Sequence, residues 1–149
     1  MNTVSNGQSA GTTGESMRLE AIKINLTGEM AARYDVYYHV HAQNFGWLDW
    51  SKNGESAGTA GYSYRLEAIE IVLVAKGATA PGATTRPFIK YPTLSYQTHV
   101  QDIGWQNSVS TGALSGTTGE AKRLEGIMIS LADSTFTGSI SYRTHVQDY

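Results

Sequence analysis

The chain has 149 residues, a net charge of −2 and no cysteine, and 16% of its residues are charged. This length suffices for one domain with a sizeable core, and the lack of cysteine excludes a disulfide framework and thiol chemistry. The sequence contains no lysine and arginine run that would bind nucleic acid, and no apolar run long enough to insert into a membrane. Richness in Gly, Ser, Thr and Tyr, with only 3 prolines, favours an all-β fold.

A seven-residue block that occurs three times organises the sequence. It begins with Arg-Leu-Glu at Arg18, Arg65 and Arg123 and continues with apolar residues at alternate positions. Alternation with a period of two is typical of a half-buried β-strand. A segment of the form Gly-x-x-x-Gly-Thr-x-Gly precedes each copy, where glycines allow tight turns, so a turn-rich loop leads into each strand.

A second kind of strand, dense in aromatic and β-branched residues, occupies residues 34–50 and returns at 96–105 and 142–149. The pattern predicts a single domain, 1–149, built from three repeats of about 47 residues. The repeats are assigned to residues 1–26 plus 141–149, to 34–73 and to 94–131. All three prolines lie around residues 78–92, which we expect to form an inserted surface loop.

The chain begins and ends inside a repeat, and its two terminal pieces together would make one. This phase predicts a closed ring in which the C-terminal strand joins the sheet that the N-terminus starts. Closure of this kind hides the edges of the sheets. We therefore expect an all-β, closed domain with three-fold pseudosymmetry, similar to a β-prism, with a β-trefoil as the alternative.

His, Gln, Gly-Trp, Gly-Thr and Arg-Leu-Glu recur in this order, for example through SGTTG and KRLEGIMISL in the last full copy. This order resembles the clostridial hydrophobic repeat (ChW) family, whose repeats carry a conserved Gly-Trp. The resemblance covers nearly the whole chain apart from the proline-bearing insertion. It implies a secreted or surface-attached bacterial protein that binds carbohydrate or protein without catalysis. The final copy departs from the pattern, because it lacks the Gly-Trp and Tyr149 is the final residue.

Three equivalent histidines, His41, His99 and His145, could bind zinc if the three-fold axis brought them together. The alternative, which we favour, is that each makes a structural hydrogen bond within its own repeat. We expect neither a metal site nor a cofactor.

The carboxylates of Glu20, Glu67 and Glu125 each follow Arg-Leu. A glycosidase needs two carboxylates facing one bond, whereas each repeat offers one. A local Arg–Glu pair is the better interpretation, so we expect no enzymatic activity.

The aromatic residues divide into two groups. Trp47 and Trp105 are interpreted as core or near-core anchors of their repeats. The aromatic residues at variable positions are candidates for a surface platform on which a sugar could stack. These are Tyr37, Trp50, Tyr62 and Tyr64.

The function predicted from the sequence is a lectin-like, carbohydrate-binding module with up to three similar sites, which avidity would strengthen. A protein-interaction or adhesion module of a surface complex is the alternative. We expect a secreted or cell-surface location for the longer protein, although no signal peptide is present in this sequence. The candidate ligand-binding residues lie near the Tyr-x-x-His-x-Gln strands, and the third site is expected to be the weakest. They are His41, Gln43, Asn44, Trp50; His99, Gln101, Asp102, Asn107; and His145, Gln147, Asp148.

Overall fold

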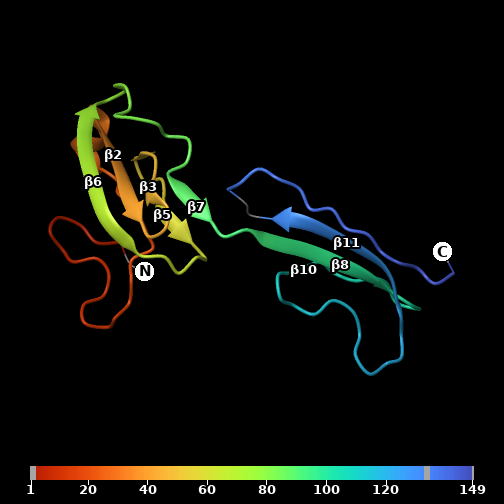
Figure 1. Cartoon of the computed structure of the whole chain (residues 1–149). Helices are drawn as coiled ribbons and strands as arrows, with labels where there is room; N and C mark the ends of the chain where they lie inside the picture. Colours follow the sequence, from red (N-terminus) through yellow and green to blue (C-terminus); the bar gives the residue numbers. More distant parts are fainter. Residues whose placement is uncertain (1–2, 133–134, 149) are drawn as a thin grey trace. The chain divides into compact units, whose positions relative to one another are not determined.

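The computed structural model describes residues 3–132 and 135–148. Its contacts divide the chain into two compact units, Met1–Lys90 and Tyr91–Tyr149 (Figure 1). The first unit carries β1 (Ala21–Ile22), α1 (Gly28–Arg33), β2 (Tyr34–Ala42), β3 (Gly46–Trp47), β4 (Ser51–Lys52), β5 (Ala57–Ala60), β6 (Leu66–Ala75) and β7 (Phe88–Lys90). The second carries β8 (Thr93–Val100), β9 (Gly104–Trp105), β10 (Val109–Ser110) and β11 (Leu124–Ala132).

Both units contain the same four-stranded antiparallel sheet. In the first, β2 lies at the centre, with β6 along one edge and the short strands β3 and β4 along the other. In the second, β8 is central between β11 and the pair β9 and β10. The two long strands of each sheet are those that the alternating sequence pattern predicts, since alternate residues share a face.

In the second and third Arg-Leu-Glu blocks, the glutamate is the extra residue of a β-bulge. The register of β6 passes from Leu66 to Ala68 against neighbouring residues of β2, which leaves Glu67 unpaired in the ladder. Glu125 is left out in the same way between β11 and β8. A bulge increases the local twist of the strand and changes the direction in which a side chain points. The repeated sequence therefore encodes a repeated local geometry.

One face of β2 forms the core of the first unit. Val36, Tyr38 and Val40 are at most 2% exposed. Partly buried side chains of the preceding repeat, Ile22 and Ile24 among them, pack against this cluster. Three backbone bonds fix the preceding repeat in place: Gly54 N donates to Ile24 O (2.8 Å), Thr59 N to Glu20 O (2.7 Å) and Leu66 N to Leu19 O (2.7 Å). The strand of one repeat thus completes the core of the next.

Gly58 lies where the backbones of two repeats approach most closely. Its φ is +124°, and a Cβ placed there would lie 2.3 Å from Glu20 O and 2.8 Å from Ala21 Cα. At the equivalent Gly11, with φ +104°, the added Cβ would meet only the Leu19 side chain, at 3.3 Å. Only Gly58 therefore combines a left-handed φ with a backbone contact that cannot give way.

We accordingly expect Gly58→Ala to destabilise the first unit more than Gly11→Ala, by about 1–3 kcal/mol, because both variants share the strained φ but only the first displaces β1. Denaturant unfolding of the two variants and the parent protein measures the difference. Equal losses in the two variants would show that the contact between β1 and β5 contributes nothing to stability.

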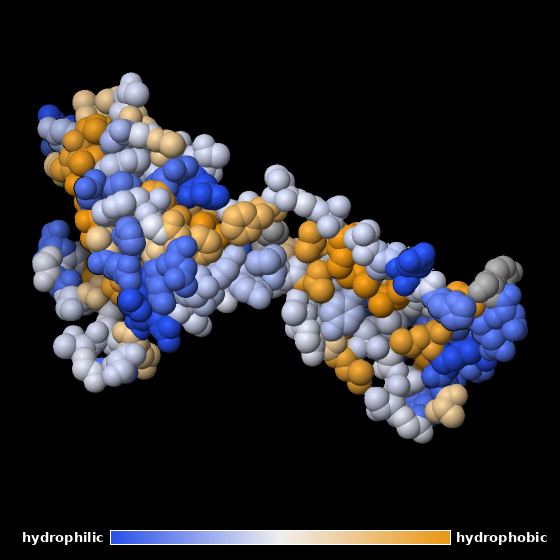
Figure 2. Space-filling model, viewed as in Figure 1, coloured by the Kyte–Doolittle hydropathy of each residue, from blue (hydrophilic) through white to orange (hydrophobic). Residues whose placement is uncertain are grey.

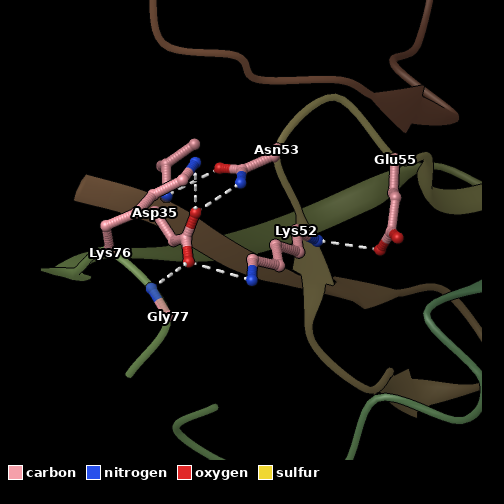
Figure 3. Close-up of polar contacts among 7 residues, drawn as sticks. Asp35, Lys52, Asn53, Glu55, Lys76 and Gly77 are labelled. Carbon is pink, nitrogen blue, oxygen red and sulfur yellow. Dashed lines mark hydrogen bonds and ion pairs between the residues drawn. The ribbon is translucent and has the colours of Figure 1, made fainter. Parts of the chain in front are cut away.

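A buried carboxylate ties together the ends of β2, β4 and β6 (Figure 3). Asp35, 1% exposed, forms ion pairs of 2.9 Å with both Lys52 and Lys76. It also accepts hydrogen bonds from Asn53 Nδ2 (2.7 Å) and Gly77 N (2.9 Å). These donors, Lys52 foremost, hold the pKa of Asp35 well below its usual range. In the second unit the position of Asp35 is occupied by an uncharged residue, Thr93.

The predicted all-β class is confirmed, because the described residues form three sheets and one short helix. No barrel closes among the sheets that the structure describes, which is consistent with the prism-like or trefoil-like class. The expected strand pairing between the two ends of the chain is wrong for the described residues, since 141–148 carry no strand and β1 pairs with β5. Closure of the three repeats into one ring stays a prediction, and Tyr149 lies outside the described residues.

One further expectation needs correction. The insertion around 78–92 is more than a surface loop, because it contains β7, which pairs in parallel with β5. Ile89 of β7 is completely buried, and Pro87 O accepts a hydrogen bond of 3.0 Å from Gly58 N. The insertion therefore contributes to the core of the first unit.

Candidate functional site

A cluster of polar side chains lies beneath an exposed tryptophan on the face of the first sheet opposite its core. His41 Nδ1 lies 3.1 Å from Glu67 Oε2. Arg65 pairs with the other oxygen of Glu67 at 2.7 Å and also donates to Gln43 Oε1 at 3.2 Å. The Trp47 ring lies edge-on to His41, with centroids 5.6 Å apart and planes at 85°. Cation, carboxylate, imidazole and indole are thus held together at one surface.

The second unit repeats this cluster. His99 Nδ1 lies 3.2 Å from Glu125 Oε2, and Arg123 lies 3.0 Å from the other oxygen of Glu125. Trp105 lies edge-on to His99, with centroids 5.4 Å apart and planes at 80°. We name the two sets the first cluster (His41, Trp47, Arg65, Glu67) and the second cluster (His99, Trp105, Arg123, Glu125). Agreement in three contacts shows that the repeated sequence, and not an accident of packing, specifies the arrangement.

Strand pairing explains the geometry of both clusters. His41 stands directly opposite Trp47 across β2 and β3, and His99 stands opposite Trp105 across β8 and β9. Side chains of directly opposed residues meet on the same face. The bulge directs Glu67 or Glu125 to the same histidine. In neither cluster does the imidazole Nδ1 make a hydrogen bond of good geometry, so its contact with the carboxylate is a charge contact when the ring is protonated.

The tryptophans are surface residues, so their interpretation as core anchors is wrong. Trp47 is 48% exposed and Trp105 is 46% exposed. A Cβ added at Gly126 would lie 3.1 Å from Trp105, which shows how closely the indole covers β11. Each indole therefore lies over the sheet with part of its surface open to a ligand. Large exposed aromatic rings beside polar groups are typical of binding surfaces.

The first cluster is extended by features that the second lacks. The His39 ring stacks between Trp47 and Trp50, with centroid distances of 4.4 Å and 3.9 Å. Its Nδ1 lies 3.1 Å from Leu48 O and its Nε2 lies 2.9 Å from Glu70 Oε2. The equivalent positions in the second unit hold Gln97 for His39, Ser108 for Trp50 and Met128 for Glu70. The two sites therefore share a common centre and differ at their margins.

Most candidate residues of the first site are near the first cluster. His41 and Gln43 belong to its hydrogen-bonded network, and Trp50 joins it through His39. Asn44 has φ +65° and forms the tight turn between β2 and β3, so its role is structural. The suggestion that Tyr37 lies on a surface platform is wrong, because its side chain is 5% exposed, with Lys52 Nζ 5.4 Å from its ring centroid.

The candidates of the second site are more dispersed. His99 is central to the second cluster. Gln101 accepts a bond of 3.5 Å from Lys122 through its main-chain oxygen and donates one of 3.0 Å to Arg123 O. Asp102, with φ +61°, forms the turn and lies 3.6 Å from Lys122. Asn107 is exposed.

The third predicted site merges with the second. His145 and Gln147 line an open groove of about 880 Å³ together with Trp105, Arg123 and Glu125. Asp148 lies beyond this groove in a turn, with φ +64°. The sequence predicted three separate sites, whereas the structure places residues of two copies around one groove in the second unit.

The carboxylates and histidines show local pairing, as predicted for the Arg–Glu pairs. Each histidine of the two clusters contacts the glutamate of its own repeat, and His41 and His99 belong to different units. Across residues 3–132 and 135–148, no group of three potential ligands could hold a metal ion. The exposed tryptophans and the Arg–Glu–His contacts were not foreseen as one site. The sequence feature that could have revealed this site is the short spacing from the histidine to the Gly-Trp, which is that of a hairpin turn and places the two side chains opposite each other.

The sheets and the paired surface clusters define an all-β repeat protein with matching sites on successive repeats. A family model for ChW, described as clostridial hydrophobic W, matches residues 1–28, 41–75 and 99–133, together more than half of the chain. The chain therefore belongs to the ChW family, and it is a repeat module of bacterial proteins. No curated protein and no solved structure matches it. In the described part of the chain, no helix has the length and apolarity to cross a membrane.

Proposed function

We propose that the chain is a non-catalytic carbohydrate-binding module of a secreted or cell-surface bacterial protein. The observation that carries the proposal is the exposed tryptophan above an Arg–Glu–His network, present in both units. An indole face stacks on the C–H face of a sugar ring, and fixed guanidinium and carboxylate groups bind its hydroxyls. The extracellular location follows from what the ChW resemblance implies.

The carboxylates support binding rather than hydrolysis. Glu67 and Glu125 are each held by an arginine and a histidine of the same repeat. A glycosidase needs a second carboxylate across the scissile bond. The first cluster has Glu70 nearby, but Met128 takes its place in the second. A feature that only one copy has cannot be the shared chemistry of both sites.

Two sites on one chain suit a repetitive glycan. Each site alone would bind weakly, because an open surface excludes little water. Simultaneous engagement of both units by a polymer turns the second binding event into an intramolecular one and raises the overall affinity. The first site, with its added His39 and Trp50, is expected to be the more selective of the two.

The tryptophans provide the test. We expect Trp105→Ala and Trp47→Ala each to weaken binding at their own site by at least about tenfold, and the double variant to lose binding. A glycan array identifies the ligand, and titration of intrinsic tryptophan fluorescence measures the affinity of the full chain.

Leu131→Ala is the matched control, because Leu131 is 39% exposed and lies on β11 but on the opposite face of the sheet from the second cluster. It is expected to bind as the parent protein does. An array that stays silent with neutral, acidic and sialylated glycans at millimolar concentration would contradict the proposal. The alternative, a module that binds another protein, would then be favoured, and the exposed apolar residues of β6 are the observation that supports it.

A further inference from the structure

Asn-Gly is the dipeptide in which an asparagine loses its side-chain amide most readily. It occurs at Asn6–Gly7 and again at Asn53–Gly54, in the turn between β4 and β5. The backbone nitrogen of the glycine attacks Cγ of the asparagine, and the missing side chain of glycine leaves this approach unhindered. An N–Cγ bond forms, the Cγ–Nδ2 bond breaks, and the amide proton leaves with Nδ2 as ammonia. Water then opens the resulting imide at either carbonyl, which gives aspartate or isoaspartate.

The fold holds both reacting groups of the second pair in hydrogen bonds. Asn53 Nδ2 donates to Asp35 Oδ1 at 2.7 Å (Figure 3), and Asn53 Oδ1 accepts from Val36 N at 2.9 Å. Gly54 N, the atom that would attack, donates to Ile24 O at 2.8 Å. The reaction therefore requires that Gly54 N leave Ile24 and that the Asn53 side chain turn away from Asp35.

The hydrogen bond to Gly54 N comes from another repeat. Ile24 lies in the strand of the first repeat, and the side chains of Ile22 and Ile24 pack against the core of the first unit. Figure 2 shows apolar groups on the surface of this unit, and undocking of the strand would add more, which is unfavourable. A segment held at the margin of a core opens at a lower free energy than the whole unit. Opening of this strand is therefore the step that exposes Gly54 N.

The product of the reaction no longer fits the site. A carboxylate at position 53 has no proton to donate to Asp35, and its oxygen would replace Nδ2, 2.7 Å from Asp35 Oδ1. Asp35 is 1% exposed, so repulsion between the two carboxylates is poorly screened, although Lys52 and Lys76 offset part of it. Isoaspartate also lengthens the backbone before Gly54 and moves its nitrogen away from Ile24 O. Both products weaken the docking of the first repeat.

We propose that Asn53–Gly54 is a latent deamidation site that the strand of the first repeat keeps closed. Deamidation then occurs when this strand undocks, and the product prevents the strand from docking again. The equivalent residue in the second unit is Thr111, whose Oγ1 accepts from Leu94 N at 2.6 Å as Asn53 Oδ1 accepts from Val36 N. A hydroxyl is therefore sufficient for the structural bond, and the amide of Asn53 adds the reactivity.

The first experiment measures the rate of deamidation at Asn53 in the full chain at mildly alkaline pH, by mass spectrometry of its peptides. We expect the native chain to react at least about tenfold more slowly than the chain unfolded in denaturant. Ile24→Ala, which weakens the docking of the strand, is expected to raise the native rate by at least about threefold. Equal rates in the native and unfolded parent chain overturn the proposal.

Ile69→Ala is the matched control, because it removes the same atoms from β6 of the same unit, opposite Val40. It is expected to deamidate at the parent rate. Circular dichroism verifies that both variants are folded. If Ile69→Ala accelerates the reaction as much as Ile24→Ala does, the strand of the first repeat is not what closes the site, and the proposal is wrong.

A second experiment tests the consequence of the reaction by thermal melts. Asn53→Asp, which reproduces one product, is expected to lower the Tm of the first unit by on the order of 5 °C. Asn53→Thr, which copies the second unit, is expected to melt clearly closer to the parent. Asn44→Asp is the control, since Asn44 is exposed and also has a left-handed φ, +65° against +44° at Asn53. It is expected to melt as the parent does, and an Asn53→Asp variant that does the same would contradict the proposal.

Discussion

Replacing Tyr38 with alanine is expected to lower the free energy of unfolding of the first unit by about 3–5 kcal/mol. Tyr38 is completely buried in the centre of β2, and its hydroxyl donates a hydrogen bond to Glu55 O. The substitution leaves a cavity between β2 and the strand of the preceding repeat and an unpaired carbonyl. Native-state hydrogen exchange of the β2 amides measures this loss in the first unit alone.

Two comparisons separate the contributions to this effect. Tyr38→Phe keeps the ring and removes only the hydroxyl, so a smaller loss of about 1–2 kcal/mol is expected. Tyr96, the equivalent residue of β8, also donates to a carbonyl, that of Ala113, but it is only half-buried. Tyr96→Ala is therefore expected to cost the second unit clearly less than Tyr38→Ala costs the first. Equal losses at the two tyrosines would contradict the assignment of the main core to the β2 face.

The second large effect is expected at Asp35. Asp35→Asn leaves Lys52 and Lys76 without their carboxylate and is expected to lower the Tm of the first unit at neutral pH by on the order of 10 °C. Glu29→Gln is the control, because it removes the same charge from an exposed pair with Arg33, 3.7 Å away. Surface pairs of this kind contribute little, so the control is expected to melt as the parent protein does.

The effect of Asp35 depends on pH in a defined direction. Its pKa is lowered in the folded state, chiefly by Lys52, so its contribution is complete above the unfolded value of about 3.9 and is lost as the pH falls below about 4 toward the folded value. The pKa of Lys52 is raised, chiefly by Asp35. The contribution of Lys52 to the stability of the fold is therefore lost only as the pH rises above 10.5. Thermal melts of the parent protein and Asp35→Asn are expected to converge below pH 4. A constant difference between them from pH 7 to pH 2 would show that the carboxylate acts through shape and not through charge.

Local pattern was enough to predict the repeat and its two longest Arg-Leu-Glu strands, but it also predicted a strand in 141–148 that the structure does not contain. The alternation in 66–75 and 124–132 predicts strands because side chains of a strand point alternately to opposite faces. The Arg–Glu pairs were predictable because the two residues are close together in the chain, but the bulge that turns each glutamate toward its histidine was not predicted. The structure confirms these strands and pairs.

The face that each aromatic residue occupies was not predictable. A period of two shows that Tyr37, His39 and His41 share a face, but it does not show which face another segment will cover. Ile22 and Ile24 of the preceding repeat cover the other face of β2, the one that carries Tyr38. Trp47 consequently lies on the open face and Tyr38 in the core, although both are aromatic residues of the same hairpin.

The sequence by itself determined the all-β class, the three ChW repeats and the local contacts within each repeat, because these depend on residues close together in the chain. Only the tertiary structure decided that Asp35 is buried between two lysines, that Ile89 of the insertion enters a core, and that β6 pairs with β2. These features depend on segments that are distant in sequence. Burial and strand pairing depend on what packs against a strand, and a strand's own residues do not specify that partner.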